Sequence, residues 1–287
     1  MAQVQHKIEN ALMRAVYPLF VKLRRPRPAG QTKLDLSKFE LVFEEDFSDP
    51  ALPRWDVRRY PDGRRVTMRK GGYWSRDMAA VEDGQLHIRA VFRPDGPYGP
   101  GYYAACLDTR YTYQQTYGYF ECRCKLPAAE GLWSSFWLQS DAVKAGVPPT
   151  AGMEIDVFES PLYRQKDNGI VTTNLHYNGY GPGHRFQNVG FFRVDEPYTQ
   201  FHTYGVEWNA REYIFYIDGF ETARSSFGGV SQGPEYMMLS VEVDGVGGYP
   251  DNGWSGNIRQ NAPGALPADF VVDYVRAYQY KDKGRRA

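Results

Sequence analysis

Cysteine is scarce in this chain: its 287 residues include only three, Cys106, Cys122 and Cys124. An odd number without a framework spacing argues against a disulfide-stabilised scaffold and predicts free thiols. Cys122 and Cys124 are two apart in a predicted strand, which is a poor geometry for bridging each other. No further Cys or His is near enough in the sequence to complete a metal site. We therefore expect all three to be small buried hydrophobic residues.

An excess of charge of either sign is also missing, because 34 Lys and Arg balance 34 Asp and Glu. Nucleic-acid affinity rests largely on an excess of basic phosphate contacts, so this balance argues against a nucleic-acid-binding protein. It argues more weakly against strongly charged, sulfated polysaccharides as substrates.

A long uninterrupted apolar run is missing as well. Residues 8–23 have helix-like apolar spacing, but Arg14 and Pro18 interrupt it and a basic run follows. The segment is too short and charged for a transmembrane helix, and it lacks the features of a secretory signal. We expect a packed helical arm or a flexible leader rather than a helix lying on a membrane surface. The predicted division is an N-terminal helical arm with its linker at 1–36 and one main domain at 37–287.

What the chain does contain is typical of an all-β protein. Tyr, Phe and Trp make up 15% of the residues, and 29 Gly and 19 Pro supply turns between short strands. Long runs rich in Ala, Leu, Glu and Lys, which would indicate helical bundles, are absent. Short apolar or alternating runs bounded by turn residues predict strands in an antiparallel β-sandwich. Examples are residues 85–90, 118–124, 204–208, 213–219 and 270–276.

One strand, Gly-Met-Glu-Ile-Asp-Val-Phe-Glu at 152–159, carries three acids: Glu154, Asp156 and Glu159. In a regular strand the first two share a face and Glu159 points to the other side. One extra residue in a bulge between Asp156 and Glu159 would place all three on one face, and bulges often lie beside active sites.

Crowding three carboxylates disfavours the ionisation of each, and a structural protein has little reason to accept that cost. A retaining glycosidase needs one ionised and one protonated carboxyl group about 5–5.5 Å apart. The alternatives are a solvated acidic face and a calcium site. The aromatic strand at 133–138 argues against the first, and calcium ligands usually come from a loop. The residues alone therefore favour catalysis.

Several segments resemble glycoside hydrolase family 16, in the order in which that family carries them. Residues 154–159 are similar to its Glu-x-Asp-x-x-Glu signature in the bulged form. The other similar segments are 41–47, 118–127, 131–138, 201–208, 217–219 and 272–278. The resemblance implies a β-jelly-roll sandwich of two antiparallel sheets, of the concanavalin A-like type, with a substrate groove across the concave sheet.

By position, the resemblance also implies roles for the three acids. Glu154 would be the nucleophile, Asp156 its assisting neighbour and Glu159 the general acid/base. No cofactor would be required for this catalysis.

Further residues are implied to bind sugar or metal. Trp133 and Trp137 would stack on sugars, and His176 would be a polar contact near the cleaved bond. Asp273, with an acid among residues 44–46, falls where some members of the family hold a structural calcium.

The chain departs from the family at 239–245, where Leu-Ser-Val-Glu-Val-Asp-Gly replaces the run common in β-1,3-glucan-cleaving members, so Glu242 is a candidate for a different groove contact.

The expected function is that of a retaining endo-β-glycosidase acting on a β-linked polysaccharide or oligosaccharide, with endo-β-1,3-glucanase preferred. The first alternative is an endo-β-galactanase or endo-β-galactosidase, and the second is a non-catalytic carbohydrate-binding sandwich. We expect a monomer. Free thiols and the missing signal pattern favour the cytoplasm, although a polysaccharide-degrading enzyme normally works outside the cell.

Overall fold

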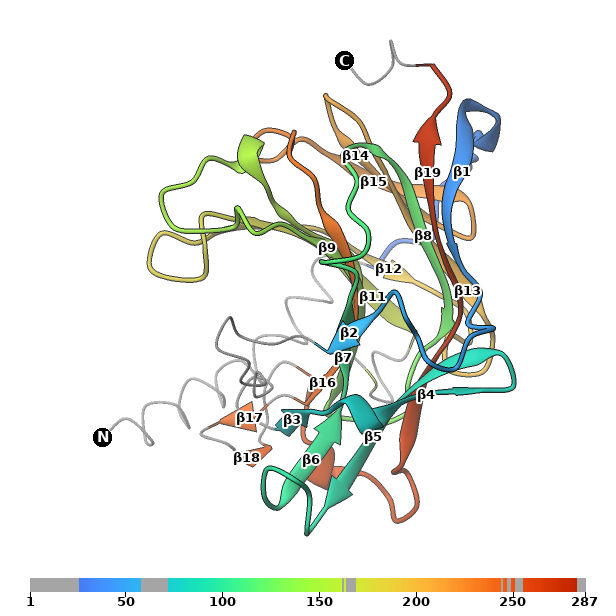
Figure 1. Ribbon diagram of the computed structural model, residues 1–287, viewed down its shortest axis with the longest axis vertical. Coiled ribbons are helices and arrows are strands. Elements are labelled where there is room, and N and C mark those ends of the chain that lie inside the picture. The colour runs from blue at the N-terminus through green and yellow to red at the C-terminus, as the bar shows by residue number, and fades with distance from the viewer. Residues whose placement is uncertain are drawn as a thin grey trace.

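The fold was analysed in a computed structural model, which describes residues 26–57, 72–161, 163, 169–243 and 255–282, together with the backbone of 245–246 and 249–250. The predicted helix at 8–23 lies outside the described residues, so the division of the chain at residue 36 stays a prediction. Within the described residues the protein is an all-β sandwich of two large sheets, as the composition predicts (Figure 1).

The larger sheet has ten strands. From one edge these are β15 (Phe220–Ser225), β14 (Tyr213–Ile217), β13 (His202–Trp208), β8 (Gly118–Lys125), β19 (Ala268–Tyr280), β5 (Gln85–Arg93), β6 (Gly101–Ala104) and β3 (Gly72–Trp74), with β1 (Phe39–Glu45) beside β19 and β4 (Ala79–Glu82) beside β5. Its described strand pairs are antiparallel except β3 with β6, which is parallel.

The smaller sheet has seven strands, all paired antiparallel. In order they are β12 (Arg185–Arg193), β11 (Ile170–Tyr177), β10 (Glu154–Ser160), β9 (Leu132–Gln139), β16 (Tyr236–Val243), β7 (Cys106–Asp108) and β2 (Asp56–Val57). A separate two-stranded pair is formed by β17 (Gly245–Val246) and β18 (Tyr249–Pro250). The described helices are single 3₁₀ turns: η1 (Leu36–Lys38), η2 (Arg76–Met78), η3 (Pro149–Ala151) and η4 (Ile258–Gln260).

The core lies between the two sheets. Phe158 of β10 packs against Tyr204 of β13 and Phe270 of β19, with ring centroids 4.3 and 6.1 Å apart. The three cysteines are free and buried in this core, which confirms the expectation from their scarcity. Side chains of a strand alternate between its two faces. Where one residue of the smaller sheet faces the core, its neighbours in a regular strand therefore point to the outer face of that sheet.

The segment before η1 lies across an edge of the sandwich. The Arg27 N–H donates to the Phe191 carbonyl of β12 at 3.0 Å, and the Gly30 N–H donates to the Glu221 carbonyl of β15 at 2.7 Å. Because β12 and β15 belong to different sheets, this segment connects the two edges. The described part of the predicted linker is therefore bonded to the main domain.

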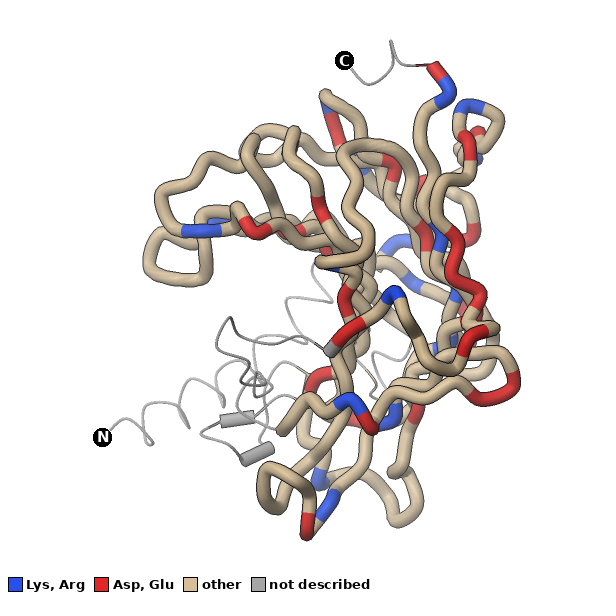
Figure 2. The backbone as a smooth tube through the Cα atoms, in the orientation of Figure 1, with Lys and Arg blue, Asp and Glu red and all other residues tan. Residues whose placement is uncertain are grey.

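Charged residues of both signs are interspersed over the described backbone, without a broad region of one sign (Figure 2). In the same described residues, no helix combines the length and the apolar character needed to cross a membrane. The interspersed charge agrees with the balanced composition of the sequence.

Candidate active site

The predicted bulge is present in β10. Asp156 pairs with Trp137 of β9, and the next pair is Phe158 with Phe136, so Val157 is the extra residue. On the other side, Glu154, Asp156 and Glu159 pair with residues 176, 174 and 172 of β11. These partners are two apart and share one face, so the three acids share a face as well. The bulge prediction is confirmed, and the acids point away from the larger sheet.

Glu154 is held by donors from two directions. Gln139, at the end of β9, donates from Nε2 to Glu154 Oε2 at 2.8 Å, and the Tyr180 hydroxyl donates to the same oxygen. The side chain is buried, with 5% of its surface exposed. The two donors therefore hold one carboxyl oxygen of Glu154 in place.

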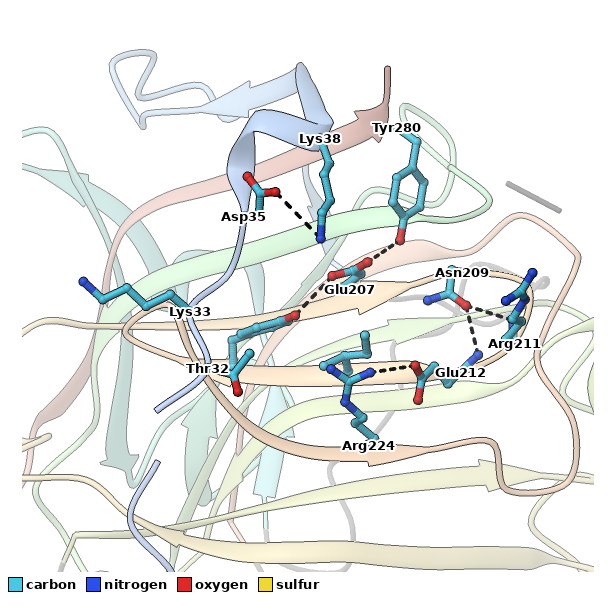
Figure 3. Close-up of a pocket in the computed structure, with 12 residues that line it drawn as sticks. Thr32, Lys33, Asp35, Lys38, Glu207, Asn209, Arg211, Glu212, Arg224 and Tyr280 are labelled. Atoms are coloured by element: carbon cyan, nitrogen blue, oxygen red, sulfur yellow. Dashed lines mark hydrogen bonds and ion pairs between the residues drawn. The ribbon is translucent and has the colours of Figure 1, made fainter. Parts of the chain in front are cut away.

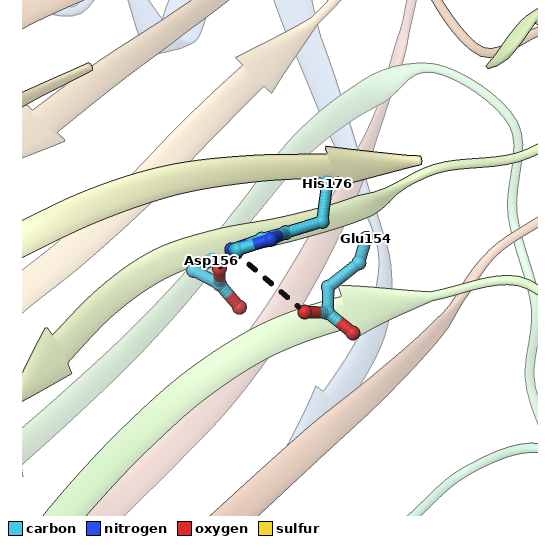
Figure 4. A group of neighbouring side chains, drawn as sticks. All are labelled: Glu154, Asp156 and His176. Atoms are coloured by element: carbon cyan, nitrogen blue, oxygen red, sulfur yellow. Dashed lines mark ion pairs between the residues drawn. The ribbon is translucent and has the colours of Figure 1, made fainter. Parts of the chain in front are cut away.

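Asp156, two residues further along β10, and His176, on the neighbouring strand β11, lie beside Glu154 (Figure 4). His176 Nε2 is 3.1 Å from Asp156 Oδ2 and 4.0 Å from Glu154 Oε1. The ligand atoms of these three residues lie within 4.8 Å of one another, close enough to hold a metal ion by distance. Gln139 and Tyr180 both bind Oε2 of Glu154, whereas Oε1 is the oxygen that faces His176.

Glu159 is fixed by side-chain amides. Asn174 donates from Nδ2 to Glu159 Oε2, and its own Oδ1 accepts from Asn188 Nδ2 at 2.9 Å. Asn188 also donates to the Thr172 hydroxyl at 2.5 Å. Only 6% of Glu159 is exposed. These bonds run across β10, β11 and β12 and hold one carboxyl oxygen of Glu159 in place.

The structure places the predicted sugar-binding residues on the same face as the acids. Trp133 and Trp137 occupy alternate positions of β9, and Trp137 pairs with Asp156. Trp137 Nε1 donates to the Ser240 hydroxyl of β16 at 3.1 Å. Glu242 pairs with Trp133 and is also buried. Their contact with sugar stays a prediction.

Asp273, the predicted calcium ligand, lies on β19 in the other sheet. Its carboxylate is paired with Arg123 and accepts from Gln85 Nε2 at 3.4 Å. Glu44, one of the acids suggested beside it, is paired with Arg276 at 2.7 Å. Guanidinium groups at these carboxylates repel a calcium ion, so the donor set fits calcium poorly. Calcium binding there stays a prediction.

Four polar residues of the site were not predicted from the sequence. Gln139 and Asn174 continue the two-residue alternation that includes Trp137 and His176, so strand periodicity could have found them. Tyr180 and His184 come from the turn between β11 and β12, where no period applies.

The cavity in Figure 3 is elsewhere, on the larger sheet. It has a volume of about 450 Å³, and several of its polar groups are paired with one another. Glu207 accepts from the Tyr280 hydroxyl at 2.7 Å, and Arg224 pairs with Glu212 at 2.8 Å.

An inner strand of one sheet thus presents three carboxylates on the outer face of a two-sheet jelly roll, which is the arrangement expected of a glycoside hydrolase. The family model described as "Glycosyl hydrolases family 16" matches residues 59–260. The chain belongs to this family.

Two curated relatives are similar over most of this chain. Endo-1,3-1,4-beta-glycanase EglC of Rhizobium meliloti is 32% identical over 267 residues, which cover 85% of this chain and 53% of EglC. The chain therefore spans about half the length of that relative. A beta-glucanase of Rhodothermus marinus is 29% identical over 293 residues, covering 96% of this chain and 97% of the relative.

A solved structure supports the same fold. The laminarinase from Rhodothermus marinus matches with a TM-score of 0.65 and 28% sequence identity, over 85% of this chain and 98% of that one.

Proposed function

We propose that this chain is a retaining endo-β-glucanase that hydrolyses internal linkages of a β-1,3-glucan. One observation carries the proposal: the bulge in β10 aligns Glu154, Asp156 and Glu159 on the outer face, each within contact of polar partners. The names of the similar proteins, which are an endo-1,3-1,4-beta-glycanase, a beta-glucanase and a laminarinase, support the choice of a glucan.

The proposed mechanism has two displacements. Glu154 attacks the anomeric carbon as a carboxylate while Glu159 gives its proton to the departing glycosidic oxygen. The glycosyl–Glu154 ester then forms, and the sugar chain beyond the cleaved bond leaves with the proton. Glu159, now ionised, takes a proton from water as the water attacks the same carbon, which releases Glu154. Asp156 and His176 lie beside the nucleophile and orient it.

Substitution of the acids tests these roles. Glu154→Gln should lower hydrolysis of laminarin by roughly 10⁴-fold or more, because no nucleophile remains. Glu159→Gln should lower kcat by roughly 10²- to 10⁴-fold, the contribution of general acid–base catalysis. An aryl glycoside, whose leaving group needs no proton, should still form the glycosyl–enzyme in Glu159→Gln. The measurements are reducing-end release and mass spectrometry of the trapped ester.

Three measurements distinguish a glucanase from a galactanase and from a carbohydrate-binding protein. A panel of laminarin, lichenan, agarose and keratan-type galactan shows which linkage is cut, and cleavage of a galactan alone would replace the glucan. Sugar binding without hydrolysis of any glycan by the unmutated protein would indicate a carbohydrate-binding sandwich. NMR of the first-formed product should show the retained β-anomer, and an inverted product would contradict the assigned roles.

A further inference from the structure

An exposed group of aromatic rings adjoins the three acids on the side of β12. Phe186 of β12 pairs with His176 of β11, and His176 pairs with Glu154 of β10, so the three residues form one row across the sheet. Phe186 has 62% of its surface exposed, and Tyr180 has 57%. Burying a Phe side chain stabilises a protein, and Phe186 forgoes much of that gain. A core role therefore does not explain it.

The rings of this group lie close together, and three of them are nearly parallel. His176 and His184 have ring centroids 5.1 Å apart and planes within 6°. Phe186 lies 5.9 Å from each of them, with interplanar angles of 18° and 24°. Tyr180 lies 5.8 Å from His184, with its ring tilted by 51°. We call Tyr180, His184 and Phe186 the aromatic platform.

The platform is connected to the reacting groups by hydrogen bonds. The Tyr180 hydroxyl donates to Glu154 and accepts from Gln139 Nε2 at 2.6 Å. His184 Nε2 is 2.9 Å from His176 Nδ1, and the opposite nitrogen of His176 faces Asp156. A molecule resting on the platform is therefore next to the carboxylates, with no other described element between.

The surface suits a sugar ring. A β-linked glucopyranose holds its hydroxyl groups equatorial, so its two flat faces present C–H groups. The face of an aromatic ring carries negative charge density and attracts such positive edges. Phe186 is two strands from Glu154, about 9–10 Å at the usual strand spacing, which is within reach of a sugar next to the one that reacts.

We propose that Tyr180, His184 and Phe186 form a subsite that binds a pyranose ring of the polysaccharide next to the residue cleaved at Glu154. This subsite rests on the proposed function, and it adds a binding surface contributed by β12 and the turn before it. In this subsite, Phe186 determines how the affinity depends on the length of the oligosaccharide.

Binding to an inactive variant tests the subsite apart from catalysis. In a Glu154→Gln background, Phe186→Ala should weaken binding of laminarioligosaccharides roughly two- to twelvefold, since an aromatic contact contributes about 0.5–1.5 kcal/mol. Within a titration series from laminaribiose to laminarihexaose, the loss should appear only once the oligosaccharide is long enough to reach Phe186. Phe92→Ala is the matched control, because Phe92 is also about half exposed (49%) but lies on β5 of the other sheet.

Substitutions of His184 separate the contact of its ring with sugar from its hydrogen bond to His176. His184→Phe keeps a flat ring but removes the bond to His176, so oligosaccharide affinity should persist while kcat falls. His184→Ala should lower both affinity and kcat.

Equal affinity of the Phe186→Ala and control variants at every chain length would overturn the subsite, as would absence of oligosaccharide binding by the Glu154→Gln parent. Failure of the proposed function is seen separately, as absence of hydrolysis by the unmutated protein.

Discussion

Glu235 is a buried acid directly beside the catalytic strand. Its side chain is 0% exposed, and Oε1 accepts the Met153 N–H at 3.0 Å, one residue before Glu154. Burial, together with the nearby charge of Glu154, raises the pKa of Glu235 to about 8, although the hydrogen bond from the Met153 N–H and the nearby Ser231 hydroxyl act in the opposite direction. A neutral acid at this position holds the start of β10 without adding a fourth negative charge to the site.

This residue should make stability depend on pH. Below the ordinary pKa of 4.5, Glu235 is protonated in both the folded and unfolded states. As the pH rises from there to about 8, the unfolded state ionises and the folded state does not, so the free energy of unfolding falls by about 1.4 kcal/mol per unit. Glu235→Gln should remove this slope and leave the variant relatively more stable at higher pH.

Urea unfolding between pH about 5 and about 9 measures the effect. Glu40→Gln, an exposed acid of β1, is the control and should keep the wild-type slope. A Glu235→Gln variant whose slope matches that of the wild type would show that Glu235 ionises normally.

At the scale of the element, β10 combines two requirements that a regular strand of this sequence cannot meet together. Ile155 and Phe158 must face the core, and all three acids must face outward. The extra residue Val157 resolves the conflict, because it shifts the alternation by one position before Glu159.

Single-residue deletions test this geometry. Deleting Val157 leaves the acids two residues apart, so they keep a common face, and activity should fall by no more than roughly 10²-fold, the penalty for a displacement of about 1 Å. Deleting Ile155 makes Glu154 adjacent to Asp156, which turns Glu154 toward the core and should abolish activity and lower stability.

Laminarin hydrolysis and the midpoint of thermal unfolding distinguish the two deletions. Equal loss of activity in two equally folded variants would show that alternation in β10 does not determine the site.

At the scale of the whole molecule, the acids are held because β10 is anchored to the other sheet. Phe158 makes this connection through Tyr204 and Phe270, from strands distant in the sequence. The segment before η1 adds a second connection at the edge formed by β12 and β15. The outward face of β10 thus depends on the packing of its inward face.

Phe158→Ala should lower the free energy of unfolding by about 3–5 kcal/mol, the usual cost of a cavity left by a buried Phe. Phe92→Ala, at a half-exposed position, should change it by less than about 1 kcal/mol. Chemical denaturation measures both. Similar values for the two variants would mean that the contact between the sheets near Phe158 contributes little to stability.

The two-residue alternation of side chains in strands made much of this protein predictable from its sequence. Alternation identified β10 as a strand, and the spacing of Asp156 and Glu159 required a bulge, since both follow from a two-residue repeat within one segment. The balanced charge and the few cysteines likewise concern composition alone. For these features the sequence by itself was sufficient.

Tertiary structure alone decided which groups meet the acids. Tyr180 and His184 reach Glu154 and His176 only because the turn between β11 and β12 folds back over the sheet, and no periodicity describes a turn. Arg123 faces Asp273 because β8 and β19 pair in one particular register, although the two residues are 150 positions apart. Contacts of this kind depend on which distant strands pair and in which register, and that is settled only when the two sheets pack together.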